Sequence, residues 1–315
     1  VDALCEEILA VTSQARALLP ARTIYFGGGT PSLLSAASVE RILAVCRQLF
    51  TVESDPEITL EANPGTVTLE WLRQVRELGV NRMSFGMQSA DPVDLRILER
   101  EHGVMDVIRA MEWSRKAGFQ NLSLDLIYGI PGQSLTSWAN SLDFALRLRP
   151  EHLSLYSLTV EAGTPFAHRI QRGLLQLPEE DLAADMYDYA CQRLDDADFI
   201  HYEISNWARQ DARSDYRCLH NLQYWLMLPY LGFGAGAHGF AAGKRTANVG
   251  GVKAYIRRCS GEDQRSFPAG PATASLISID RWAEMQETMM VGLRLLEHGV
   301  SAAKFEQQFA IGLWE

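Results

Sequence analysis

The feature that most constrains the fold of this chain is a repeated alternation of two kinds of segment, which begins at residue 23. Short runs of β-branched and apolar residues alternate five times with longer segments of helical period. This pattern is typical of parallel strands joined by crossover helices. It predicts strands at residues 23–26, 57–61, 82–87, 122–127 and 152–158, and helices at residues 38–49, 68–78, 104–117, 135–148 and 179–195. The predicted fold class is therefore α/β, with functional groups at the carboxyl ends of the strands.

A different pattern begins after residue 205. A polar, aromatic-rich stretch is followed by glycine-dense sequence at residues 232–251 and by a helical segment at residues 279–296. The apolar positions of that last segment are expected in the core: Trp282, Met285, Met289, Val291, Leu293 and Leu296. We therefore predict two domains, a barrel domain at residues 1–205 and a smaller C-terminal region at residues 206–315.

Composition narrows the class of function. The chain has 315 residues, of which 47% are hydrophobic, and a formal net charge of −10, so we expect a large core and no nucleic-acid partner. No apolar run of about 18 residues is present, and the start of the chain is acidic rather than basic, so we predict a cytoplasmic protein that is not transmembrane. A homodimer and peripheral contact with a membrane stay open. The five scattered cysteines predict reduced thiols.

The first predicted strand runs into three glycines, Gly27, Gly28 and Gly29, followed by Thr30. Each glycine costs about 0.5 to 1 kcal/mol of chain entropy relative to alanine. Two interpretations stay open for this segment, a tight strand-to-helix turn and a place where a ligand approaches the backbone closely. No Gly-Lys-Ser/Thr sequence follows, so a P-loop is not indicated.

Polar side chains also stand at the ends of the next predicted strands. Glu61 ends the second strand, Gln88 follows the third, Arg100 comes soon after it, and Asp125 lies among apolar neighbours in the fourth. An unpaired buried carboxylate costs several kcal/mol, so Asp125 needs a partner. Singly, each of these groups is more often structural. Together they suit a small polar molecule with an amine, a carboxylate and hydroxyls.

Ordered motifs along nearly the whole chain resemble the coproporphyrinogen oxidase and HemW branch of the radical S-adenosylmethionine superfamily. They are GGGTPSL at 27–33, EANPGT at 61–66, NRMSFGMQS at 81–89, DLIYGIPG at 125–132, LSLYSLTVEAGTPF at 153–166, YEISN at 202–206, HNLQYW at 220–225 and YLGFGAGAHG at 230–239. The resemblance implies a partial parallel (β/α)6 barrel of the radical SAM type. It also implies S-adenosylmethionine contacts at Gly28, Gly29, Thr30, Glu61, Gln88, Arg100 and Asp125.

The HNLQYW segment separates the two branches. The HemW branch carries His-Asn-x-x-Tyr here, which implies that His220, Asn221 and Tyr224 bind haem, with His220 as a ligand of the haem iron, for delivery to acceptor proteins. An imidazole and neighbouring aromatic rings suit a flat iron macrocycle. Without the resemblance, a half-buried structural histidine is the more frequent role. Cys218 and His238 lie near in sequence as candidates for a second ligand.

The chain departs from the superfamily in one respect. The CxxxCxxC motif that binds a 4Fe–4S cluster is absent. We therefore expect a fragment whose barrel domain lacks its first strand and cluster loop and whose C-terminal region is also truncated. On this interpretation only the parent protein binds the cluster, and the chain itself is inactive in radical chemistry.

Other functions were weighed against the haem chaperone. An oxygen-independent coproporphyrinogen III oxidase, which decarboxylates propionates, is compatible with a chain that has four lysines and therefore 25 arginines among its 29 basic residues. The GxGxxG sequence at 234–239 is typical of dinucleotide-binding oxidoreductases, but residues 240–251 predict a turn or hairpin instead of a helix. A Schiff-base aldolase is not indicated, because no lysine falls at a predicted strand end.

Overall fold

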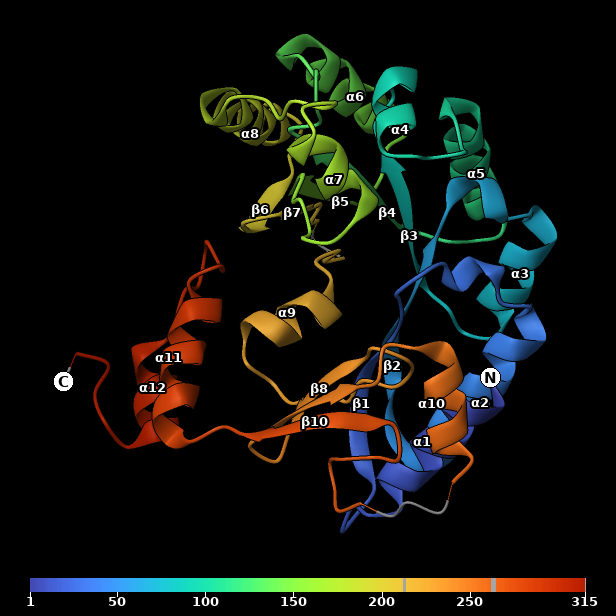
Figure 1. The fold of residues 1–315 in the computed structure, drawn as a ribbon, viewed down its shortest axis with the longest axis vertical. Coiled ribbons are helices and arrows are strands. Elements are labelled where there is room, and N and C mark those ends of the chain that lie inside the picture. The colour runs from blue at the N-terminus through green and yellow to red at the C-terminus, as the bar shows by residue number, and fades with distance from the viewer. Residues whose placement is uncertain (212–213, 262–264, 315) are drawn as a thin grey trace. The chain divides into compact units, whose positions relative to one another are not determined.

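The computed structural model describes residues 1–211, 214–261 and 265–314. Its elements follow the predicted alternation (Figure 1), and each of the five predicted strands and helices of the barrel domain is present. The helices are α1 Asp2–Thr12, α2 Ala36–Leu49, α3 Leu69–Glu77, α4 Pro92–Ile97, α5 Val104–Lys116, α6 Leu135–Arg147, α7 Pro165–Gln171, α8 Glu180–Asp195, α9 Leu219–Trp225, α10 Val252–Cys259, α11 Arg281–Gly292 and α12 Ala302–Phe309, with short 3-10 helices η1 Pro31–Leu33 and η2 Pro64–Thr66. The strands are β1 Leu19–Phe26, β2 Phe50–Ala62, β3 Arg82–Gln88, β4 Asn121–Tyr128, β5 His152–Ser157, β6 Ile200–Glu203, β7 Asn206–Ala208, β8 His238–Ala241, β9 Lys244–Asn248 and β10 Thr273–Ser278.

The chain forms two compact units. One consists of residues 1–24, 35–57 and 219–315, and the other of residues 25–34 and 58–218. The predicted division into a domain of residues 1–205 and a region of residues 206–315 stays a prediction.

The second unit carries most of a seven-stranded sheet with the order β1-β2-β3-β4-β5-β7-β6. Strands β2 to β5 pair in parallel, whereas β7 pairs antiparallel with both β5 and β6. Because α3, α5 and α6 join successive parallel strands, this unit has the predicted α/β crossover architecture. The sheet ends in an antiparallel hairpin instead of a further parallel strand, and the hairpin strands have only four and three residues.

The two faces of this sheet differ in chemistry. On one face, large apolar side chains such as Leu60, Phe85 and Leu124 are fully buried, and α5, α6 and α8 cover that face (Figure 1). Burial of each such side chain stabilises the fold by about 1.5 to 3 kcal/mol. Because side chains alternate along a strand, the other face receives the polar residues of the same strands, including Ser84 and Ser154.

Side-chain caps explain where several of the connecting helices begin. Ser35 accepts a hydrogen bond from the Ser38 amide at the start of α2, and Thr68 and Ser134 do the same at the starts of α3 and α6. Such caps satisfy an amide that has no partner within the helix. Each cap therefore fixes the residue at which its helix begins.

The first unit is held together by a buried carboxylate on α1. Glu7 is 1% exposed and accepts hydrogen bonds from the Gly234 amide (2.8 Å), the Asn248 amide group (2.6 Å) and the Tyr255 hydroxyl (2.6 Å). Burial raises the pKa of Glu7, and these three bonds oppose that shift. The N-terminal helix is thereby tied to the glycine-rich segment, to β9 and to α10.

The GxGxxG sequence at residues 234–239 also lies in the first unit. Its last two residues belong to β8, which forms a hairpin with β9, and β10 completes a three-stranded antiparallel sheet. A dinucleotide-binding fingerprint must open a helix. The predicted hairpin is confirmed, and the dinucleotide-binding alternative is excluded by this context.

One prediction about the core is wrong. The apolar positions of α11 and the turn after it were expected to be buried, yet Trp282 is 64% exposed, Leu293 63% and Leu296 50%. Helix α11 packs against α9 and is hydrogen-bonded to α12, yet these three side chains stay exposed. None of the described helices has both the length and the apolar content needed to span a lipid bilayer.

Candidate functional site

The glycine segment after β1 folds its backbone onto the end of β2. Gly28 and Gly29 adopt φ values of +79° and +65°, which favour glycine, and the Gly28 amide donates to Glu61 Oε2 at 3.2 Å. A Cβ atom on Gly27 would lie 2.7 Å from the Tyr25 ring and 3.2 Å from Glu61 Oε1. The segment is therefore both a tight turn and a close approach of backbone to a carboxylate.

Glu61 is fixed from its other side by Tyr25. The Tyr25 hydroxyl donates to Glu61 Oε1 at 2.7 Å. Burial and the charge of Glu61 raise the pKa of Tyr25, so the phenol keeps its proton and acts as the donor. Glu61 is half-buried at the strand end, where it can accept hydrogen bonds from an ammonium group or hydroxyls of a ligand.

Asp125 has the hydrogen-bond partners that a carboxylate among apolar neighbours requires. The Ser84 hydroxyl lies 3.1 Å and 3.2 Å from its two carboxylate oxygens, and Ser154, which pairs with Asp125 across β4 and β5, also binds it. Burial raises the pKa of Asp125 to about 6, while Ser154, the positive charge of Arg82 and Ser84 oppose that shift. Asp125 is thus an acceptor whose charge changes at mildly acidic pH.

Gln88 is placed by an irregularity at the end of β3. The register between β3 and β4 shifts between Gly86 and Gln88, and Gln88 adopts a φ of +64°, which is uncommon for a residue with a side chain. A Cβ atom on Gly86 would lie 2.7 Å from the Gln88 amide nitrogen, so the side chain folds back over the glycine. Because Gly86 pairs with Asp125, this brings the Gln88 amide to the same face as Asp125.

His102 supports the irregular end of β3. It is 5% exposed, and burial lowers its pKa, so the ring is neutral and its Nε2 donates to the Met87 carbonyl at 3.1 Å. That carbonyl directly precedes Gln88. His102 therefore holds the peptide that gives Gln88 its left-handed conformation.

The remaining two predicted residues lie at the edge of this set. Thr30 is half-buried and its carbonyl accepts the Leu33 amide at 3.1 Å, which begins η1. Arg100 is exposed after α4, and its side chain is in no hydrogen bond within the described part of the chain. The structure therefore joins Gly28 and Glu61, places Gln88 beside Asp125, and leaves Arg100 outside the hydrogen-bonded group.

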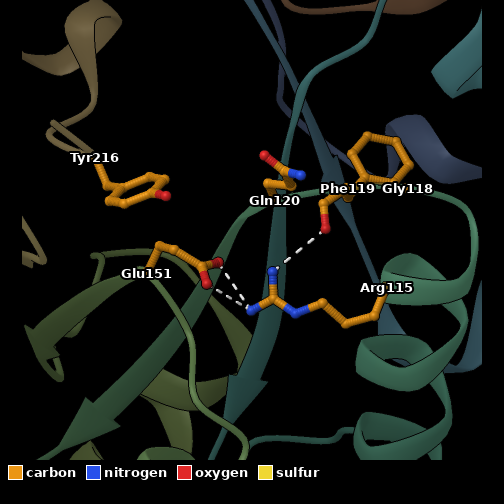
Figure 2. Close-up of a pocket in the computed structure, with 6 residues that line it drawn as sticks. All are labelled: Arg115, Gly118, Phe119, Gln120, Glu151 and Tyr216. Carbon is orange, nitrogen blue, oxygen red and sulfur yellow. Dashed lines mark hydrogen bonds and ion pairs between the residues drawn. The ribbon is translucent and has the colours of Figure 1, made fainter. Parts of the chain in front are cut away.

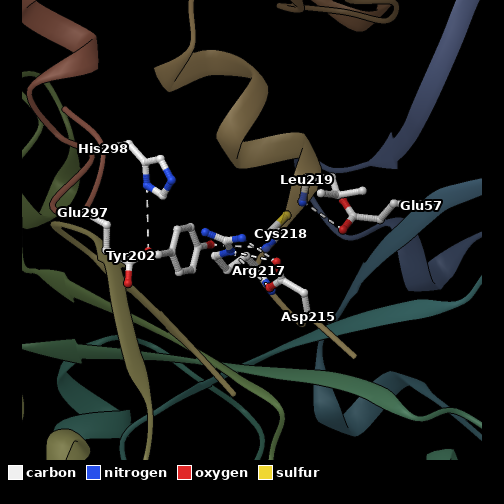
Figure 3. Close-up of polar contacts among 8 residues, drawn as sticks. All are labelled: Glu57, Tyr202, Asp215, Arg217, Cys218, Leu219, Glu297 and His298. Atoms are coloured by element: carbon white, nitrogen blue, oxygen red, sulfur yellow. Dashed lines mark hydrogen bonds and ion pairs between the residues drawn. The ribbon is translucent and has the colours of Figure 1, made fainter. Parts of the chain in front are cut away.

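The HNLQYW segment forms α9 in the first unit. The Glu57 carboxylate accepts from the Leu219 amide at 2.9 Å (Figure 3). It also accepts from the His220 amide at 3.0 Å, and the two bonds anchor the start of the helix. Nδ1 of His220 lies 2.8 Å from the Thr23 hydroxyl, and Nε2 lies 2.9 Å from the Tyr224 hydroxyl. His220 is thus half-buried and oriented by groups on both sides of its ring.

Aromatic rings surround this histidine. The Tyr224 ring meets the His220 ring edge to face at 5.1 Å and the Tyr230 ring at 4.6 Å. Asn221 is half-buried on the same helix. This arrangement offers one imidazole and two phenol rings, which suits a flat aromatic ligand better than a small polar one.

The two candidates for a second haem ligand differ in exposure. Cys218 is fully buried, and its amide donates to the Tyr202 hydroxyl at 3.4 Å (Figure 3). His238 is exposed at the start of β8. A buried thiol cannot receive a ligand without local opening, so His238 is the more accessible of the two.

A hollow of about 380 Å³ lies at the opposite, amino-terminal edge of β4 and β5, lined by Arg115, Gly118, Phe119, Gln120, Glu151 and Tyr216. Figure 2 shows the Arg115 guanidinium between the Glu151 carboxylate, at 2.7 Å, and the Phe119 carbonyl, at 3.3 Å. Glu151 also accepts the Leu122 amide at 2.9 Å. The charged groups are paired with each other and with the backbone, so this ion pair fastens the starts of the two strands.

Comparison with known proteins places the chain. A model of the radical SAM superfamily matches residues 3–145. The heme chaperone HemW of Bacillus subtilis is 38% identical over 293 residues, which cover 93% of this chain and 74% of the relative. The chain belongs to the HemW family. HemW of Lactococcus lactis is 37% identical over 98% of this chain and 78% of its own length.

The fold of this HemW family member also matches a solved structure. Coproporphyrinogen III oxidase (HemN) from Escherichia coli, a radical SAM enzyme, superposes with a TM-score of 0.80 over 98% of this chain and 71% of that chain. The two sequences are 24% identical. This likeness confirms the radical SAM type of fold that the motifs predicted.

Of the two cofactors that the superfamily implies, S-adenosylmethionine fits the residues of this chain and the 4Fe–4S cluster does not. The acceptors Glu61 and Asp125 and the open glycine turn fit the amine, hydroxyls and backbone contacts of S-adenosylmethionine. No group of three or more His, Cys, Asp or Glu side chains within the described ranges is arranged to hold a metal ion, and the five thiols are scattered. A 4Fe–4S cluster therefore does not fit the cysteines of this HemW family chain.

Several residues of this HemW family site escaped sequence reasoning. Tyr25, Ser84 and Ser154 bind the predicted carboxylates, and Thr23 binds the predicted haem ligand. A signal for them is present in the strands, because polar residues occur at every second position, as in Asn121, Ser123 and Asp125. Strands buried on both faces are normally apolar throughout, so this alternation indicates a polar face.

Proposed function

We propose that the chain is the haem-handling part of a chaperone that binds haem at α9 and delivers it to acceptor proteins. The observation that carries the proposal is the geometry of His220, held half-buried between Thr23 and Tyr224 in a chain that is 38% identical to Bacillus subtilis HemW. A cytoplasmic location and haem-acceptor proteins as partners belong to the same proposal.

His220, Asn221 and Tyr224 would hold the haem. Bound haem would supply an iron that accepts an imidazole nitrogen as a ligand. His220 offers Nε2 for this, while the phenol rings of Tyr224 and Tyr230 provide faces for the macrocycle. Asn221 offers an amide that can bind a polar substituent of the ring.

S-adenosylmethionine would bind at the strand ends of the second unit. This molecule supplies a sulfonium, an amino acid group and an adenosine. Glu61 and Asp125 would accept hydrogen bonds from its ammonium and hydroxyls, Gln88 would do so beside them, and exposed Arg100 can reach a carboxylate. Gly28, Gly29 and Thr30 would admit it close to the backbone.

The test is a haem titration followed at the Soret band. Wild type is expected to bind one haem, and His220→Ala is expected to lose it, whereas His168→Ala serves as a control at an exposed histidine on α7. If His220→Ala binds haem as the wild type does, α9 is structural. The coproporphyrinogen oxidase alternative would then remain, and it is tested with coproporphyrinogen on the parent protein carrying its cluster.

A further inference from the structure

We propose that Thr23 is a positioning residue for haem ligation: its hydroxyl oxygen accepts the Nδ1 proton of His220, which leaves Nε2 to bind iron after Tyr224 releases it. This inference rests on the proposed function, because it assigns roles around the same histidine. Thr23 is not part of the HNLQYW motif, because it lies 197 residues before His220.

The histidine is held by more than one constraint. The Glu57 carboxylate anchors its main-chain amide at 3.0 Å, and the Thr23 hydroxyl meets Nδ1 at 2.8 Å. Glu57 and Thr23 belong to strands β2 and β1, so both contacts come from a sheet and not from a loop. The ring therefore has a preset direction that leaves Nε2 pointing at Tyr224.

Proton placement follows from the requirement for ligation. A neutral imidazole carries one proton, and the nitrogen that binds a metal must be the one without it. If Nδ1 carries the proton, it donates to Thr23, and Nε2 has a lone pair. The Tyr224 hydroxyl then donates to Nε2 in the haem-free protein at 2.9 Å.

On haem binding, Nε2 of His220 exchanges the Tyr224 hydroxyl for iron. The hydrogen bond from Tyr224 to Nε2 breaks, the bond from Nε2 to iron forms, and the phenol keeps its proton and turns to another acceptor. No electron or proton leaves the site. Tyr224 thus competes with iron for Nε2. Thr23 favours iron binding, because a hydrogen bond at Nδ1 orients a ligating histidine and raises the basicity of Nε2.

Matched variants separate these two roles. Thr23→Val keeps the size of the side chain and removes the acceptor, so haem affinity should fall by about tenfold, and Thr23→Ser should restore it. Tyr224→Phe removes the competing donor, so affinity should rise by about threefold to tenfold. The readout that a merely structural role would not move is the iron–imidazole stretching frequency of the ferrous complex, which should fall in Thr23→Val and recover in Thr23→Ser.

A second design keeps the proposal testable if Thr23→Val folds poorly. In His220→Gly, free imidazole should restore the Soret band of the histidine-ligated complex, with a higher stretching frequency than in His220→Gly combined with Thr23→Ala. Equal frequencies in the two backgrounds overturn the role of Thr23. If His220→Ala loses haem while Thr23→Val matches the wild type in affinity and frequency, the inference fails and the chaperone proposal stands. If His220→Ala keeps its haem, the proposed function fails first.

Discussion

The Tyr255 hydroxyl donates a 2.6 Å hydrogen bond to the buried carboxylate of Glu7, across 248 residues of chain. Glu7 also accepts from Gly234 and Asn248, so a single side chain joins the beginning of the chain to its last third.

Replacing this carboxylate should destabilise the protein strongly. Glu7→Ala removes the acceptor of three buried or partly buried donors, and we expect a loss of about 3 kcal/mol in the free energy of unfolding. Glu7→Gln keeps an acceptor oxygen and should lose less. Urea denaturation measures both. The matched control is Glu6→Ala, because Glu6 is exposed on the same helix, and an equal loss in that variant would contradict the role of Glu7.

Asp125 should give the stability of the protein a defined pH dependence. Its pKa of about 6 in the folded protein exceeds the ordinary 3.8, so the folded state holds the proton more tightly than the unfolded chain. The stability that this contributes is complete below pH 3.8 and is lost as the pH rises through about 6. Asp125→Asn should lack this decline when the free energies of unfolding of both proteins are compared between pH 4 and pH 8. Parallel curves for the two proteins would show that Asp125 does not titrate in this range.

The glycine segment should tolerate no side chain at its first position. Gly27→Ala places a Cβ atom 2.7 Å from the Tyr25 ring, so Tyr25 or Glu61 must move, and we expect about 1 to 3 kcal/mol of destabilisation. Binding of S-adenosylmethionine, measured by calorimetric titration, should weaken in the same variant. Gly250→Ala is the control, since Gly250 is exposed and a Cβ atom there meets nothing within 4 Å.

His102 should matter for Gln88 as well as for stability. His102→Ala removes the donor to the Met87 carbonyl and leaves a cavity, with an expected cost of about 2 kcal/mol. His102→Gln retains a donor of similar reach and should recover part of the stability and of the affinity for S-adenosylmethionine. An unchanged affinity in His102→Ala, with the protein still folded, would separate the bulge from ligand binding.

The strand and helix alternation was predictable because it is a local pattern. The ends of β2 and β4, and hence Glu61 and Asp125, followed from apolar runs interrupted by a carboxylate and a turn. The start of β2 was missed by seven residues, because the residues of its first half, such as Glu53 and Asp55, are exposed and show no apolar run. Helices α4, α7 and α9 have only six or seven residues, too few for a helical period to show.

The partners of the candidate site residues could not be predicted in the same way. The bond between Tyr25 and Glu61 and the bond between Thr23 and His220 join segments that no periodicity relates. The conformation of Gln88 depends on a shift of register between neighbouring strands, which exists only once the sheet has formed. The exposed face of α11 was misjudged because apolar spacing indicates a face to be covered but not whether any residue covers it.

The dispersal of the first unit over three stretches, 1–24, 35–57 and 219–315, has a consequence for synthesis on the ribosome. Helix α1 emerges long before its partners, because the acceptor oxygens of Glu7 meet them only when residues 234 to 255 have also emerged. At about 5 to 20 residues per second, the nascent helix waits roughly 10 to 50 seconds with its apolar side exposed. A holdase that binds short amphipathic helices would therefore find its target during this interval and lose it when residues 234 to 255 arrive.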